Sequence, residues 1–333
     1  MKKILFVPVL FLLFVSCIKE FDLKLSNSEK LLVVDGLITN GNGPYFVRLT
    51  RSSNNLNTKY ILPTNWDFEN SFKDSAEVVT NATVIISDNL GNCDTLIKVP
   101  QYYAGYVQFY NSNTHVWDSI YNPQLEERYG INKGFYRTTH IKGVAGRFYN
   151  LKILIENKEY YSQCFMPLLP KIDSLSYIKK ISEIKGEPYY SPVIYFTKPT
   201  ETSYYLFNFW MNSPLNPPNK TSLPYINSIG VFDYSIISTK LLNSYINGLD
   251  IQKGACVKRT MFEYPFSENE IVLTMNSITK ESFEFYDNLI DQYNNDGGAF
   301  KPTPSSPVGN ISNGALGFFR ASATIELRKK ITP

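Results

Sequence analysis

Tyr149-Asn150-Leu151-Lys152-Ile153-Leu154-Ile155 carries the clearest β-strand signal in the sequence. Every second residue from Tyr149 onward is apolar, and in an extended chain these side chains fall on one face. Glu156-Asn157-Lys158 then turns the chain back into a second strand, which runs from Glu159 to Met166. The pattern predicts a hairpin with one buried face, as in a β-sandwich.

Two further hairpins are expected before this one. Leu31–Thr39 is predicted to be a buried strand with a bulge at Asp35-Gly36. The turn Asn40–Gly43 connects it to an alternating strand from Pro44 to Arg51. The other hairpin joins Ala82–Asp88 to Cys93–Val99.

The second half of the chain begins after Pro167-Leu168-Leu169-Pro170, a stiff segment that marks the expected domain boundary. One helix is predicted there, from Thr279 to Tyr293, because Thr279 can cap it and aromatic residues recur at helical spacing. Its apolar face is expected to lie against a sheet. That face consists of Phe283, Tyr286, Ile290 and Tyr293.

The predicted fold is mostly β, with two β-sandwich-like (Ig-like) domains, the second carrying one packed helix. The abundance of aromatic residues, 24 tyrosines and 22 phenylalanines, supports strands over helices. The expected organisation is a signal peptide at 1–16, a tether at 17–30, an N-terminal domain at 31–168 and a C-terminal domain at 169–333.

Charge and composition narrow the classes of partner and cofactor. The 33 basic and 30 acidic residues nearly balance and form no basic stripe, so no nucleic-acid partner is expected. The sequence contains two histidines and four scattered cysteines, which predicts neither a metal site nor a cofactor. Cys93 and Cys164 are expected either to form a disulfide or to be small buried residues.

The N-terminus indicates where the protein works. Lys2 and Lys3 precede an apolar run, Ile4 to Val15, that is too short to span a membrane and has the layout of a secretory signal. Phe14-Val15-Ser16-Cys17 resembles a bacterial lipobox, which implies cleavage between Ser16 and Cys17 and a lipid on Cys17. The alternative is an ordinary signal peptide with an incidental cysteine.

Several separated stretches, in order along the mature chain, resemble one family. They are Val33–Thr39, Gly43-Pro44-Tyr45, Gly143–Gly146, Met166-Pro167 with Ile172-Asp173-Ser174, and Asn310–Phe319. Together they are similar to the Bacteroidota lipoproteins grouped as domain of unknown function 4249. Gly314-Ala315 departs from the pair of glycines expected in that family. The resemblance implies a lipoprotein of the outer membrane, often encoded beside TonB-dependent transporters, and it implies no catalytic residues.

The resemblance also bears on location. Lys19-Glu20, just after Cys17, is similar to an incomplete signal for export to the cell surface in such lipoproteins; a solvated tether is the alternative. The expected location is therefore the outer membrane, lipid-anchored, at the cell surface, with the periplasmic face left open.

Motifs of the common hydrolases are missing from the sequence, which lacks both Gly-x-Ser-x-Gly and His-Glu-x-x-His. Asp287 and Asp291 are four residues apart on the predicted helix, but such a pair is more typical of a solvent-facing surface than of an acid–base couple. A faint calcium-loop pattern at Gln292–Gly297 is better explained by the end of the helix. The protein is therefore expected not to be an enzyme.

Aromatic residues in or beside loops are candidates for contacting a sugar or a peptide, because their rings stack and tyrosine also forms hydrogen bonds. The alternative is that they are core or cross-strand residues. The candidates are Trp66, Phe68, Tyr102, Tyr103, Tyr106 and Trp117.

An Asp-Ser/Thr-apolar pattern occurs four times and resembles an O-glycosylation signal of Bacteroidota envelope proteins. The candidate hydroxyls are those of Ser75, Thr95, Ser119 and Ser174. For Ser174, a turn at the domain boundary is an equal explanation.

These observations predict a non-enzymatic lipoprotein that accompanies a TonB-dependent β-barrel transporter and helps to capture its substrate. One alternative is an envelope structural or adhesion protein. A second is an unrecognised enzyme acting on glycan or peptide.

Overall fold

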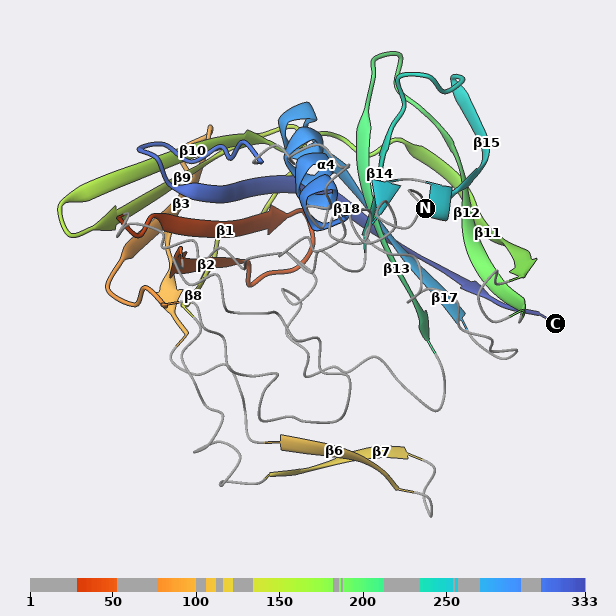
Figure 1. The fold of residues 1–333 in the computed structure, drawn as a ribbon, viewed down its shortest axis with the longest axis horizontal. Helices are drawn as coiled ribbons and strands as arrows, with labels where there is room; N and C mark the ends of the chain where they lie inside the picture. The colour runs from red at the N-terminus through yellow and green to blue at the C-terminus, as the bar shows by residue number, and fades with distance from the viewer. Residues whose placement is uncertain are drawn as a thin grey trace, which may run out of the picture.

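The computed structural model confirms a mostly β protein with sandwich-like packing, and its described residues include one α-helix (Figure 1). It describes residues 29–52, 77–99, 106–111, 116–121, 134–181, 186, 188–212, 234–253, 255–256, 270–294 and 307–332. No helix in this part of the chain is long and apolar enough to cross a membrane.

The described strands form four sheets. The largest, in spatial order, contains β16 (Ala255–Cys256), β14 (Tyr234–Ser238), β13 (Tyr204–Asn212), β17 (Glu270–Ile278), β18 (Leu316–Lys330), β1 (Leu32–Thr39), β2 (Phe46–Arg51), β8 (Phe135–Arg137) and β5 (Ile97–Lys98). The second contains β10 (Lys158–Phe165), β9 (Phe148–Ile155), β3 (Thr83–Asp88) and β4 (Cys93–Thr95). The third contains β11 (Lys171–Ile181), β12 (Pro188–Thr197) and β15 (Tyr245–Asp250), and the fourth pairs β6 (Tyr106–Asn111) with β7 (Val116–Tyr121).

The predicted hairpin at residues 149–166 is confirmed as β9 and β10, which pair from Phe148↔Phe165 to Ile155↔Lys158. Tyr149, Leu151 and Ile153 are buried, as their alternation predicts. They pack against the buried face of β1 and β2, so the second sheet and one half of the largest sheet form the first sandwich. Figure 1 shows these two layers, with β10, β9 and β3 above β1 and β2.

The bulge predicted at Asp35-Gly36 is wrong. β1 keeps an unbroken register with β2 on one side and β18 on the other. Gly36 is required by packing, because a Cβ atom there would lie 2.8 Å from Cδ2 of the Phe319 ring. The glycine thus marks a close approach between a strand and an aromatic ring, without any irregularity of the backbone.

β18 connects the two halves of the molecule. Its first half pairs with β1 in parallel, and its second half pairs with β17 in the antiparallel sense. Phe319 and Ala321 belong to the first hydrophobic core, whereas Ile325 and Leu327 pack against the second. The domain division at residues 168/169 stays a prediction, and the last strand contributes to the cores on both sides of it.

The predicted helix is confirmed as α4 (Lys280–Asn294), one residue later at each end than expected. Thr279 caps it, because its Oγ1 accepts a hydrogen bond from the Ser282 backbone N–H at 3.2 Å. Tyr286 and Ile290 are buried against strands β13, β14 and β17, and Phe283 packs beside them. The fourth predicted contact, Tyr293, has a side chain outside the description.

Candidate functional site

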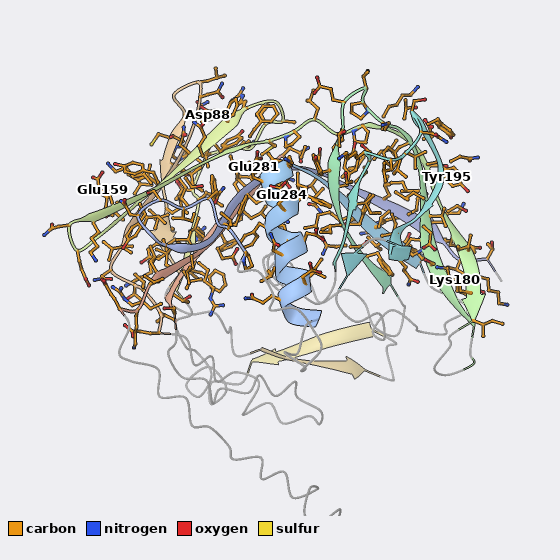
Figure 2. All side chains as sticks on the ribbon, turned by 45° about the horizontal axis from the view of Figure 1, so that its top comes forward. Asp88, Glu159, Lys180, Tyr195, Glu281 and Glu284 are labelled. Carbon is orange, nitrogen blue, oxygen red and sulfur yellow. The ribbon has the colours of Figure 1, made fainter. Side chains whose placement is uncertain are left out.

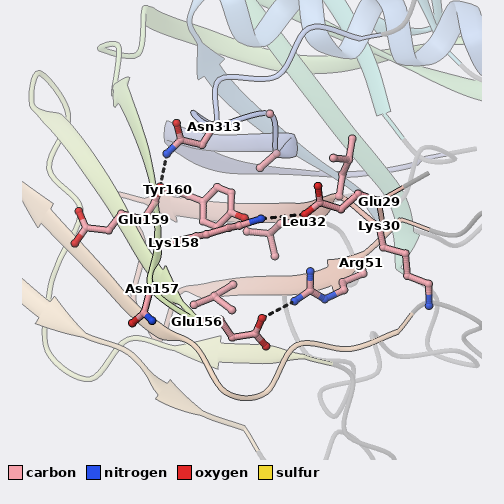
Figure 3. Close-up of a pocket in the computed structure, with 14 residues that line it drawn as sticks. Glu29, Lys30, Leu32, Arg51, Glu156, Asn157, Lys158, Glu159, Tyr160 and Asn313 are labelled. Carbon is pink, nitrogen blue, oxygen red and sulfur yellow. Dashed lines mark hydrogen bonds and ion pairs between the residues drawn. The ribbon is translucent and has the colours of Figure 1, made fainter. Parts of the chain in front are cut away.

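A charged pocket of about 550 Å³ lies at the end of the first sandwich, where the described chain begins (Figure 3). Glu29 Oε1 lies 2.9 Å from Lys158 Nζ, so an exposed ion pair links the first described residue to the β9–β10 turn. Arg51 lies 3.8 Å from Glu156, on the same turn. Because these charges pair with one another, the pocket offers little net charge to a charged ligand.

A second, shallow groove of about 620 Å³ lies on the outward face of the β3–β9–β10 sheet. Its floor is a row of uncharged polar side chains in cross-strand register: Gln163 on β10, Asn150 on β9 and Ser87 on β3. Gln163 Nε2 donates a hydrogen bond to Asn150 Oδ1 at 2.8 Å. The floor of the groove therefore consists of uncharged donors and acceptors, with Lys152 at its side, and its size falls in the range of small-ligand sites.

The next row of the same face is built around Tyr161, which is 45% exposed. Lys152 Nζ lies 5.3 Å from the centroid of its ring and 3.1 Å from Glu159 Oε1. The Tyr161 hydroxyl donates a hydrogen bond to Glu159. This bond, together with Lys152, lowers the pKa of the Glu159 carboxyl. The two charges of this row are thus paired with each other.

A loop closes the groove along the edge of β10. Ser312 binds the backbone of Tyr161 twice, because its N–H donates to the Tyr161 carbonyl at 2.9 Å and its Oγ accepts from the Tyr161 N–H at 2.8 Å. Asn313 Nδ2 donates to the Glu159 carbonyl at 2.5 Å. The backbone N–H and carbonyl of Tyr161 and the carbonyl of Glu159 are therefore already occupied at this edge of β10.

Two buried carboxylates act as structural acceptors. Burial raises the pKa of Asp94, but hydrogen bonds from the backbone of Thr139, His140 and Ile141 and from the Thr139 hydroxyl outweigh it and hold the pKa below its usual value. Asp88 is similar, since it accepts bonds from Asn92, Leu90 and Arg147. Carboxylates held ionised in this way fix loops and are poor proton donors at neutral pH.

Asp35 is different. It lies on the face of β1 that points away from the first core, next to Arg48 on β2. Burial raises its pKa to about 7, although Arg48 and Arg320 oppose the shift. On α4, burial and the charge of Asp291 raise the pKa of Asp287, and Asp291 itself is exposed.

A model of the family described as domain of unknown function (DUF4249) matches residues 18–328. The chain belongs to the DUF4249 family. No curated protein matches it.

In this structure, the motifs that resemble DUF4249 proteins allow backbone segments to pack closely and bind the backbone through hydrogen bonds. Gly317 has φ 96°, and a Cβ atom there would lie 1.9 Å from the Val34 carbonyl oxygen. Asn310 binds the backbone of Phe319 through both ends of its amide, each at 2.8 Å. A Cβ on Gly143 would lie 2.0 Å from the Thr39 carbonyl oxygen. These DUF4249 motifs therefore pack β18 and the loop at Gly143 closely against β1 and hold the backbone of Phe319.

Most of the site residues predicted from sequence lie outside the described part of this DUF4249 chain: Ser16, Cys17, Trp66, Phe68, Ser75, Tyr102 and Tyr103. Tyr106, Trp117 and Ser119 lie on β6 and β7, and their side chains are also outside the description. Thr95 and Ser174 are exposed, but Asp94 of the Thr95 motif is buried. The predicted glycosylation and ligand contacts stay predictions.

Both cysteines considered for a disulfide are free. Cys93 is exposed, whereas Cys164 is buried on the inner face of β10. Burial raises the pKa of the Cys164 thiol to about 11, so it behaves as a small apolar residue, one of the two alternatives considered. Among the described residues, no three His, Cys, Asp or Glu side chains are grouped to hold a metal ion.

Sequence reasoning missed the outward aromatic residues of the hairpin. Phe148 is 44% exposed, and its ring centroid lies 4.9 Å from that of Phe165. With Tyr161 these rings occupy the positions between the buried residues of β9 and β10. In the sequence, the one indication of this surface is that aromatic residues stand at positions that alternate with the buried residues of each strand.

Proposed function

We propose that this DUF4249 protein is a lipid-anchored outer-membrane protein of Bacteroidota that binds substrate for a TonB-dependent transporter and has no catalytic activity of its own. The observation that supports this proposal is the place where the chain joins the fold. The lipobox-like cysteine, Cys17, precedes Glu29 by a short segment, and Glu29 forms an ion pair with Lys158 at the end of the first sandwich.

This geometry limits how far the sandwich stands from a membrane. A chain extends by at most about 3.5 Å per residue, so the segment between Cys17 and Glu29 reaches about 40 Å. A tether of that length keeps the sandwich within about 40 Å of the membrane, which is close enough to act beside a transporter barrel.

Affinity purification from the native membrane tests the proposal. Outer membranes are solubilised gently, and a C-terminally tagged protein is isolated with whatever accompanies it. We expect a TonB-dependent transporter in stoichiometric amount. Recovery of the protein alone, or with other surface lipoproteins only, would contradict the proposal and favour the adhesion alternative.

The matched control is Cys17→Ala. Without the lipid, the protein is expected to stay soluble in the periplasm or uncleaved at the inner membrane, and the transporter should be lost from the purified material. A Cys17→Ala protein that still fractionates with the outer membrane would contradict the anchor.

A further inference from the structure

The outward face of the β3–β9–β10 sheet presents two aromatic groups with a polar row between them. Phe148 and Phe165 form one group, and Tyr161 forms the other. Phe165 and Tyr161 are four residues apart on β10, which corresponds to about 13 Å along a strand. That distance accommodates more than one linked sugar ring.

The polar row between the rings is chemically suited to hydroxyl groups. Within the described residues, the side-chain amides of Gln163 and Asn150 bond only to each other, through one donor and one acceptor. Each amide has two donors and an acceptor, so most of their hydrogen-bonding capacity points to solvent. A sugar hydroxyl, which both donates and accepts, fits this mixture.

The aromatic rings suit the apolar C–H face of a sugar ring. Tyr161 contacts Lys152 on one side and is still 45% exposed, so a face of the ring remains available. Aromatic rings contribute apolar contact area, and tyrosine adds a polar tip. The C–H face of a pyranose needs that kind of surface.

Charge and strand pairing argue against other occupants. Lys152 and Glu159 neutralise each other, so the face offers no unpaired charge for an anionic or cationic ligand. An extended peptide would add to the free edge of a strand, but Ser312 and Asn313 already occupy the backbone of β10 here. Figure 2 shows Glu159 and Asp88, from the two ends of this sheet, on one side of α4, with Lys180 and Tyr195 on the other.

From these observations we infer that the outward face of β3, β9 and β10 binds a neutral oligosaccharide, with Tyr161 and Phe148 stacking on sugar rings and Gln163 and Asn150 binding hydroxyl groups. This inference names a ligand class that the proposed function leaves open. It does not depend on the transporter partner, because it concerns binding by the purified protein alone.

Calorimetric titration of the full-length protein, in a detergent without a sugar headgroup, tests the inference. The probes are cellotetraose, mannotetraose, xylotetraose and maltotetraose, with the anionic tetragalacturonic acid beside them. We expect at least one neutral probe to bind, and Tyr161→Ala to weaken that binding by roughly tenfold. Tyr161→Phe keeps the ring and should stay within about twofold of the natural protein.

Tyr245→Ala is the matched control, because Tyr245 is a strand tyrosine with 46% exposure on β15, outside the first sandwich. It should leave the affinity unchanged. The inference is overturned if no neutral probe binds, if only the anionic probe binds, or if Tyr161→Ala and Tyr245→Ala behave alike while both remain folded by circular dichroism. Loss of the transporter in the affinity purification would leave this result untouched, so the two proposals can fail separately.

Discussion

Asp35 shows how one residue can make stability depend on pH. Its neighbours on the face of the sheet are Arg48, Arg320 and Tyr286, and burial raises the pKa of Tyr286. The pKa of Asp35 is about 7 in the folded protein against 3.8 as the reference, so the folded state binds this proton more tightly than the unfolded state does. The contribution of Asp35 to the unfolding free energy therefore falls as pH rises from about 4 to 7.

Replacing Asp35 by Asn removes this dependence, because the amide stays neutral. We expect Asp35→Asn to match the natural protein near pH 4 and to be more stable at pH 8. The difference between the two pKa values limits the gain in unfolding free energy at pH 8 to about 4 kcal/mol. Because Asp35 keeps some contact with solvent, we expect a gain of about 1 to 2 kcal/mol. Urea denaturation at both pH values measures it. Asp173→Asn, at an exposed position, should show no such difference, and an equal pH response of the two variants would refute the role of Asp35.

At the scale of single elements, the backbone of β18 lies so close to that of β1 at Gly317 that no side chain fits between them. Gly317 combines φ 96° with a carbonyl oxygen 1.9 Å from the place where a Cβ would lie, whereas Gly91, at φ 88°, has open space around it. Alanine at Gly91 adds only backbone strain, about 1 kcal/mol. Alanine at Gly317 must in addition push β18 away from β1.

We therefore expect Gly317→Ala to destabilise the protein by more than about 3 kcal/mol and Gly91→Ala by about 1 kcal/mol. Thermal or urea unfolding of both variants gives the comparison. Similar values for the two would mean that β18 can shift at little cost, and that the close approach to Val34 does not constrain the fold.

Local patterns predicted the elements that depend on local sequence. The β9–β10 hairpin and the α4 helix were found because alternation and helical spacing are visible within a short window. β18 was not predicted, because its partners, β1 and β17, are distant in sequence and its glycine is explained only by the Val34 carbonyl. The outward groove was missed for a related reason: the pairing of Gln163 with Asn150 depends on strand register, which residue types do not reveal.

At the scale of the whole molecule, a shared strand couples two hydrophobic cores. Ile153 lies in the first core, and β13 and β17 surround the second. If β18 makes the described sheets one cooperative unit, Ile153→Val should cost about 1 kcal/mol in the first sandwich and the same amount in the second.

Native-state hydrogen exchange measures this coupling. The slowest amides of β13 and β17 should lose about the same protection free energy as those of β9. Tyr245→Ala, at an exposed strand position, serves as the control and should change neither group. Unchanged protection in β13 and β17 of the Ile153→Val protein would show that the halves unfold independently.

The pairing of Val33 with Leu316 also sets an order of events during synthesis. β1 is made well before β18, the neighbour that fills one of its two edges, because the two strands are far apart in the sequence. Until then the first core lacks Phe319 and Ala321, so the growing chain has to be kept from pairing that open edge elsewhere. The first core is thus completed only once β18 has been made, and chains that stop short of β18 should be the ones that aggregate or are degraded.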